Sequence, residues 1–135
     1  MSTTVTIHEG GLRCCTTWES SGQMCCTDVG TALGGKGEYP SPAAMMAASV
    51  ASCMLSMIAW TGQNKGFETK GISIASAYEN NEKGQIAALV FDITVPFEAT
   101  PATRRMMEAA AKNCPVGAII DTAVEKKINW NWISV

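Results

Sequence analysis

Two cysteines that lie far apart in the sequence have the residue type and the setting for thiol chemistry. Cys53 lies within a long uncharged stretch, so its reactivity would depend on its neighbours rather than on a helix terminus. Cys114 precedes Pro115, a good first residue of a helix, and would therefore lie beside free N–H groups that favour a thiolate. Both residues also fit inert roles, Cys53 as a small buried hydrophobe and Cys114 as a simple helix cap.

Four further cysteines form two adjacent pairs on the arms of a predicted hairpin: Cys14, Cys15, Cys25 and Cys26. A turn centred on Ser20 would place Cys14 opposite Cys26 and Cys15 opposite Cys25. Facing thiols can bind a soft metal ion or oxidise together, and they can also be ordinary half-buried strand residues. A zinc site is disfavoured, because there is one histidine and no Cys-x-x-Cys spacing.

The composition excludes several functions. The net charge is −2 and the pI is near 5.3, so no basic surface for nucleic acid or anionic lipid is expected. A length of 135 residues predicts one domain over residues 1–135. Apolar residues make up 47% and charged residues 16%, which suggests that a partner subunit covers apolar surface. The N-terminus resembles no secretory signal, so we expect a cytoplasmic protein with six free thiols.

One segment is long enough to span a bilayer. Residues 42–61 carry no charge, but they are mostly Ala, Ser and Met, with few strongly lipophilic side chains. Their nearest basic residues, Lys36 and Lys65, are isolated and set no membrane orientation. We therefore expect no membrane partner, and a helix in a soluble core that is contacted on all sides.

The pattern of turns and apolar residues predicts an α+β order in which sheet segments pack on central helices. Ser41 and Pro42 are a favourable cap and first residue for the long helix. Glu19 to Gly22 predicts a hairpin turn. The other expected elements are strands at 3–8, 12–18, 23–29, 72–78, 86–97 and 128–134, a helix at 101–113 and a short helix from Pro115.

Several short motifs follow one another along the chain: the Thr27-Asp28 step, Gly34-Gly35-Lys36-Gly37, Ser41-Pro42, Ala51-Ser52-Cys53, Lys65-Gly66, Gly71, Ala110-Ala111 and Cys114-Pro115-Val116. The order and spacing of these motifs, from about Leu12 to Trp132, resemble the OsmC/Ohr family. The resemblance implies an OsmC-like two-layer α+β fold, in which a long central helix packs against antiparallel sheets. It also implies an intertwined homodimer in which the two distant cysteines meet near the subunit interface.

The resemblance further implies reduction of organic hydroperoxides in oxidative-stress defence. Cys53 would be the peroxidatic thiolate that becomes a sulfenic acid, and Cys114 the resolving thiol that condenses with it to a disulfide. A thiol or dithiol reductant would close the cycle, with no bound cofactor and no metal. The substrate pocket would be moderately apolar, with lining residues such as Met54, Met57 and Trp60.

Arg13 matches the arginine that stabilises the thiolate in the organic-hydroperoxide branch of this family. The family commonly places an acidic residue after the Ser-Pro step to orient that arginine, but Ala43 and Ala44 follow Pro42 here. Glu19 or Asp28 is a candidate substitute. A lost orienting contact can slow a reaction by orders of magnitude.

Two other functions stay open. The missing carboxylate and the surplus thiols favour a binding or sensing protein of the same fold, for an electrophile, a small apolar ligand or a soft metal. A purely structural module, with Cys53 and Cys114 as inert core residues, is the third hypothesis. Peroxide-dependent consumption of thiols would distinguish the first function from the other two.

Overall fold

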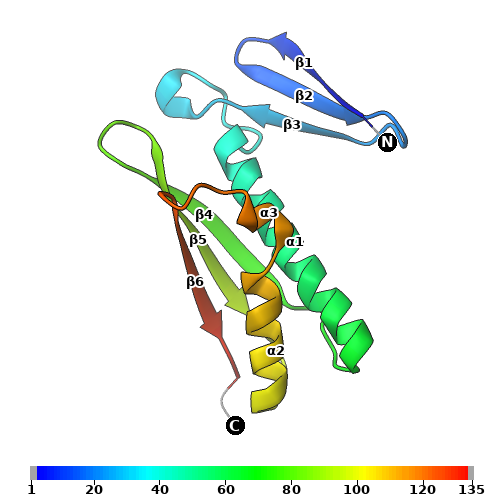
Figure 1. Ribbon diagram of the computed structural model, residues 1–135. Helices are drawn as coiled ribbons and strands as arrows, with labels where there is room; N and C mark the ends of the chain where they lie inside the picture. Colours follow the sequence, from blue (N-terminus) through cyan, green and yellow to red (C-terminus); the bar gives the residue numbers. More distant parts are fainter. Residues whose placement is uncertain (1–2, 134–135) are drawn as a thin grey trace. The chain divides into compact units, whose positions relative to one another are not determined.

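The computed structural model describes residues 3–133, and the chain divides into two compact units, Met1–Met46 and Ala47–Val135 (Figure 1). Each unit holds one three-stranded sheet. The elements are β1 (Thr4–Gly10), β2 (Arg13–Trp18), β3 (Met24–Asp28), η1 (Thr31–Leu33), α1 (Pro42–Lys65), β4 (Ser73–Asn80), β5 (Ile86–Thr94), α2 (Pro101–Lys112), α3 (Pro115–Ala118) and β6 (Glu125–Asn131). The last strand begins before its predicted start, and Ser134, which was expected in it, lies outside the described residues.

The first unit contains the predicted hairpin, but its register differs from the prediction by one residue. The backbone N–H of Trp18 donates to the carbonyl of Gln23 at 2.9 Å, so the turn consists of the four residues between them. The centre of such a turn falls between Ser20 and Ser21, and not on Ser20. Because strand neighbours alternate between faces, this shift changes every cross-strand pair.

The corrected register places Cys15 directly opposite Cys26, and their sulfurs form a disulfide. The expectation of six free thiols is therefore wrong for this pair. Opposed residues of an antiparallel pair bring their Cβ atoms within about 5.5 Å, so a cross-strand bond needs little rearrangement. Cys14 and Cys25 are free, and each faces a threonine. Among residues 3–133, no group of three or more His, Cys, Asp or Glu side chains could hold a metal ion.

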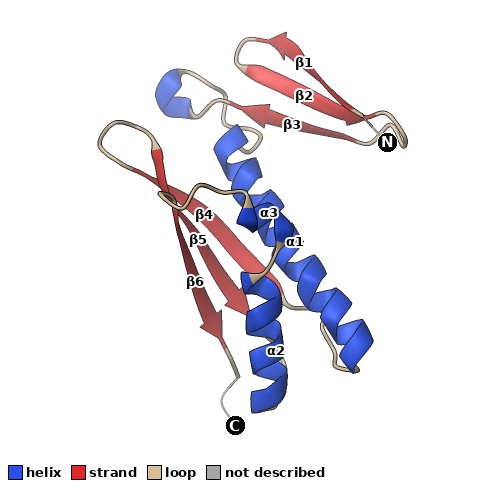
Figure 2. Cartoon of the chain, in the orientation of Figure 1, coloured by secondary structure: helices blue, strands red, loops and turns tan. Residues whose placement is uncertain are grey.

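The second unit has the sheet order β4-β5-β6, with α1 and α2 on one face (Figure 2). Leu89, Phe91 and Ile93 alternate along β5 and are fully buried, which is the pattern of a strand face covered by helices. β4 and β5 are antiparallel as expected, whereas β6 is parallel to β5. The chain between β5 and β6 includes α2 and α3, and a crossover of that length permits parallel pairing.

The long helix α1 begins at Pro42 as predicted, and the Ser41 hydroxyl accepts a hydrogen bond from the N–H of Ala44 at 3.1 Å. Its buried residues form one stripe: Ala47, Val50, Ala51, Met54, Ile58 and Gly62. The helix is long and apolar enough to cross a membrane, but only 28% of its most apolar 18-residue window is buried. Within the described residues, α1 is therefore not contacted on all sides, although the sequence had led us to expect this.

Candidate functional site

The two cysteines singled out in the sequence lie together in the second unit. Cys53 is half-buried on α1, and Cys114 is buried immediately before α3. Burial raises the pKa of the Cys114 thiol, and the neighbouring Cys53 thiol raises it further. The two sulfurs are therefore close enough to influence each other electrostatically.

A short segment around α3 holds the Cys114 sulfur. Cys114 is the N-cap of α3 as predicted, and its Sγ accepts a hydrogen bond from the backbone N–H of Gly117 at 3.2 Å. This bond and the positive charge of Lys126 lower the pKa of Cys114, but burial and Cys53 outweigh them. The buried sulfur thus has its own donor for a negative charge, although its resting form is the thiol.

A cavity of about 660 Å³ opens beside Cys114, a size typical of small-molecule sites. Its walls come from α1, α2, β6 and the α3 segment: Val50, Met54, Glu108, Ala111, Lys112, Cys114, Gly117, Lys126, Ile128 and Trp130. Met54 was expected in the pocket, but Met57 and Trp60 are not among its lining residues, and Trp60 is 61% exposed. The cavity therefore offers an apolar body with a few charged groups at its wall.

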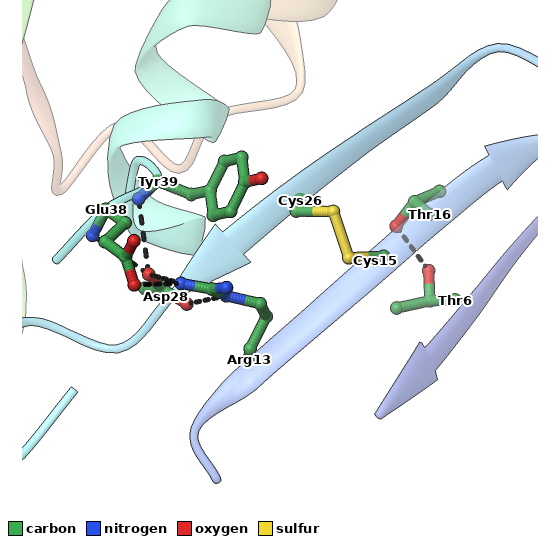
Figure 3. The surroundings of a disulfide bond; sticks show 8 residues. All are labelled: Thr6, Arg13, Cys15, Thr16, Cys26, Asp28, Glu38 and Tyr39. Atoms are coloured by element: carbon green, nitrogen blue, oxygen red, sulfur yellow. Dashed lines mark hydrogen bonds and ion pairs between the residues drawn. A yellow bond between two sulfur atoms is a disulfide. The ribbon is translucent and has the colours of Figure 1, made fainter. Parts of the chain in front are cut away.

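Arg13 lies in the first unit, where Figure 3 shows its guanidinium group against the Asp28 carboxylate. Arg13 Nε donates to Asp28 Oδ1 at 2.7 Å, and Nη2 donates to Asp28 Oδ2 at 2.8 Å. Nη2 also donates to Glu38 Oε1 at 2.9 Å. Of the two substitutes considered for the missing acidic residue, Asp28 orients Arg13, and Glu19 is not among its partners.

Asp28 is held by more than the arginine. Its side chain is only 2% exposed, and it also accepts the backbone N–H groups of Glu38 at 3.0 Å and Tyr39 at 3.2 Å. These bonds, led by the one from Arg13, lower the pKa of Asp28 to about 2. The same carboxylates raise the pKa of Arg13. The Tyr39 ring lies 4.6 Å from the guanidinium carbon, so Arg13 is fixed on several sides.

A family profile of OsmC-like proteins matches residues 35–129, which is more than half of the chain. The chain therefore belongs to the OsmC-like family. The matched range includes Cys53 and Cys114 but not Arg13. No curated protein sequence matches the chain.

Solved structures share the fold over nearly the whole chain. A Psychrobacter arcticus protein, named for osmotic stress induction and a detoxification response, has a TM-score of 0.92 and 25% identity, with 97% of this chain and 96% of that chain covered. An organic hydroperoxide resistance protein OsmC from Legionella pneumophila has a TM-score of 0.74 and 18% identity, with coverage of 97% and 96%. The organic hydroperoxide resistance protein OhrB of Bacillus subtilis has a TM-score of 0.69 and 15% identity, with coverage of 97% and 98%.

These likenesses confirm the expected OsmC-like α+β fold, with its long helix and two small sheets. Neither the family match nor these structures indicate a membrane protein. The apolar helix α1 is accordingly the central helix of an OsmC-like fold.

Proposed function

We propose that this protein reduces organic hydroperoxides, with Cys53 as the peroxidatic residue and Cys114 as the resolving residue. The observation that carries the proposal is the proximity of these two thiols, which come from separate parts of the sequence and influence each other electrostatically. Membership of the OsmC-like family supports it, as do the hydroperoxide-resistance names of the Legionella and Bacillus proteins.

The proposed reaction has two steps in the protein. The Cys53 thiolate attacks the distal oxygen of the hydroperoxide, an S–O bond forms, the O–O bond breaks, and the alkoxide takes up a proton to leave as an alcohol. The Cys114 thiol then attacks the sulfenic acid, and the disulfide forms with release of water. A thiol or dithiol reductant returns both cysteines to the reduced state. The apolar wall of the cavity beside Cys114 suits the organic part of such a peroxide.

Arg13 is proposed as the cation that stabilises the Cys53 thiolate. Two carboxylates restrain its guanidinium group in the first unit, so it is oriented without an acidic residue after Pro42. The alanines at positions 43 and 44 are therefore no argument against this role.

We also propose that the protein works as a homodimer, in the cytoplasm. Supporting this, α1 leaves most of its apolar window uncovered within one chain. Exposed apolar side chains on β1 and at the start of β3, namely Val5, Ile7 and Met24, also suit a covering partner. Light scattering after size-exclusion chromatography would test this, with twice the chain mass of 14.3 kDa as the expected result.

The test of the activity is a titration of fully reduced protein with cumene hydroperoxide, followed by mass mapping of every cysteine. We expect stoichiometric loss of peroxide and a Cys53–Cys114 disulfide. Cys53→Ser would abolish peroxide loss, whereas Cys114→Ser would leave one turnover and a trapped sulfenic acid. The double variant Cys14→Ser/Cys25→Ser is the matched control and keeps full activity. Oxidation of the hairpin cysteines is followed separately in the same maps.

The cavity also supports a second function, the binding of a small apolar ligand without turnover. That function would be supported if Cys53 and Cys114 stay reduced in the titration while the added peroxide remains unreacted. In that case, a screen of apolar ligands against the intrinsic fluorescence of Trp130, which lines the cavity, would follow.

A further inference from the structure

We infer that Gly117 and Lys126 position the Cys114 sulfur for disulfide formation with Cys53. This inference rests on the proposed function, in which Cys114 resolves the oxidised form of Cys53. Both residues line the cavity beside Cys114, but their hydrogen bonds are to Cys114 and to each other, so we assign them as positioning residues. Without them, we expect the first oxidation of Cys53 to proceed and its resolution to slow.

Gly117 is the residue that the sulfur packs against. It is buried, its N–H donates to Cys114 Sγ at 3.2 Å, and a Cβ added there would lie 2.7 Å from that sulfur. A contact this short forces the sulfur to move, and the added Cβ would also lie 3.7 Å from Val50 Cγ1 and 3.9 Å from Lys126 Nζ. The backbone of Gly117 is not in the left-handed region, so its conformation does not require glycine. The close approach of Sγ is what requires it.

Lys126 holds the other side of the same residue. Lys126 lies on β6, and its Nζ donates a hydrogen bond to the carbonyl oxygen of Gly117 at 2.8 Å, which connects α3 to the sheet. Lys126, Gly117 and Cys114 line the same open cavity, so the lysine and the cysteine face one shared space. A positive charge there favours the thiolate form of Cys114.

The chemistry of resolution explains why this position matters. The Cys114 sulfur must lose its proton as it attacks the sulfenic sulfur of Cys53; an S–S bond forms, the S–O bond breaks, and hydroxide leaves with the proton as water. The thiolate is the attacking form, and the buried sulfur reaches it with the help of the Gly117 N–H and the Lys126 charge. A small displacement of the sulfur or loss of the charge therefore slows this step selectively.

The experiment measures the two steps separately in one turnover. Fully reduced chain receives one equivalent of cumene hydroperoxide, dimedone traps any sulfenic acid, and mass spectrometry compares the Cys53 adduct with the Cys53–Cys114 disulfide. We expect Gly117→Ala to lower the rate of disulfide formation at least about tenfold relative to its own rate of peroxide consumption, compared with the same ratio in the wild-type protein. Alanine is otherwise the better helix former, so a merely structural role predicts no such loss.

The lysine is tested in parallel. Lys126→Met is expected to slow disulfide formation about threefold to tenfold, and Lys126→Arg to restore it, because arginine keeps the charge and the donor. Lys127→Met is the matched control, since Lys127 is the next residue on β6 and pairs with Glu79 instead. If Gly117→Ala folds poorly, as judged by its circular dichroism and urea midpoint, the Lys126 series alone decides the matter.

Diamide, which oxidises dithiols without a peroxide, separates failure of the inference from failure of the proposed function. Suppose that the wild-type protein does not react with peroxide, and that diamide forms the Cys53–Cys114 disulfide more slowly in Gly117→Ala and Lys126→Met than in the wild-type protein. The peroxidase proposal then fails and the inference stands. If both variants form the disulfide at the wild-type rate with either oxidant, the inference is overturned.

Discussion

Asp28 accepts two parallel hydrogen bonds from Arg13, the residue directly opposite it on the neighbouring strand of the hairpin. A planar guanidinium group can bind both oxygens of a carboxylate at once, whereas an ammonium group cannot. The pair therefore fixes the orientation of the cation as well as its charge. Glu38 completes the arrangement from the loop that precedes α1.

Replacement of Arg13 by lysine tests whether that orientation matters. We expect Arg13→Lys to slow the oxidation of Cys53 by cumene hydroperoxide by about tenfold or more, because the charge remains but the fixed geometry is lost. The second-order rate constant from stopped-flow measurements gives the answer. Arg105→Lys, an exposed position on α2, is the control and is expected to react normally. An unchanged rate in Arg13→Lys would show that the fixed orientation of the cation does not matter for this step.

The depressed pKa of Asp28 predicts a defined dependence of stability on pH. The unfolded carboxyl has a pKa of about 3.9, whereas the pKa in the folded protein is about 2. Above the unfolded value the folded state gains the full stabilisation, and this gain is lost as the pH falls from about 4 to about 2. We therefore expect Asp28→Asn to lower the urea midpoint between pH 5 and 7, and this difference to shrink towards pH 2.

The control for that measurement is Glu82→Gln, an exposed substitution in the turn between β4 and β5. Its urea midpoint is expected to stay close to that of the wild-type protein across the same range. A wild-type advantage over Asp28→Asn that persists at pH 2 would contradict the assignment.

The Cys15–Cys26 disulfide is expected to stabilise the first unit. It joins residues separated by 11 positions, and closing a loop of that size in the unfolded chain contributes about 2–3 kcal/mol. The variant Cys15→Ala/Cys26→Ala is expected to lose that amount in urea unfolding at fixed protein concentration. Cys14→Ala/Cys25→Ala removes the two free neighbours and is expected to lose little. Dithiothreitol lowers the midpoint of the wild-type protein and leaves that of the first variant unchanged if this bond is responsible.

Gly35 is expected to tolerate no side chain. A Cβ at this position would overlap the backbone carbonyl of Val29, and a backbone group cannot turn aside as a side chain can. Gly35→Ala is therefore expected to cost about 1–3 kcal/mol in the free energy of unfolding. Gly30→Ala in the same loop has open space and a negative φ, so it is expected to be neutral or slightly stabilising. Equal effects of the two substitutions in urea titrations would contradict this explanation of the glycine-rich loop.

Much of the fold follows from local sequence. Pro42 and Pro101 mark the starts of the two longer helices, and the four-residue turn after Trp18 lies where Gly22 and its polar neighbours predict it. The exact pairing of the hairpin was beyond reach, because turn residues alone do not say whether the centre lies on a residue or between two. The Cys15–Cys26 bond and the pairing of Arg13 with Asp28 both depend on where the centre of the turn lies.

The site was less predictable than the fold. Glu38 lies in an irregular loop with no periodicity, so no sequence signal joined it to Arg13. Met57 and Trp60 were expected to line the cavity beside Cys114 but do not, because a helix distributes its residues over several faces. Lys126 was missed because its distance from Cys114 depends on the parallel pairing of β6 with β5.

The late position of β6 in the sequence has a consequence for how the cavity beside Cys114 forms during synthesis. Cys53 leaves the ribosome early, but the strand that supplies Lys126, Ile128 and Trp130 to the wall beside Cys114 is translated about 75 residues later, a delay on the order of 4–15 s. During this interval the nascent chain carries an apolar helix with a free thiol, and its binding cavity is still unfinished. The cavity beside Cys114 is thus completed only when β6 has paired with β5.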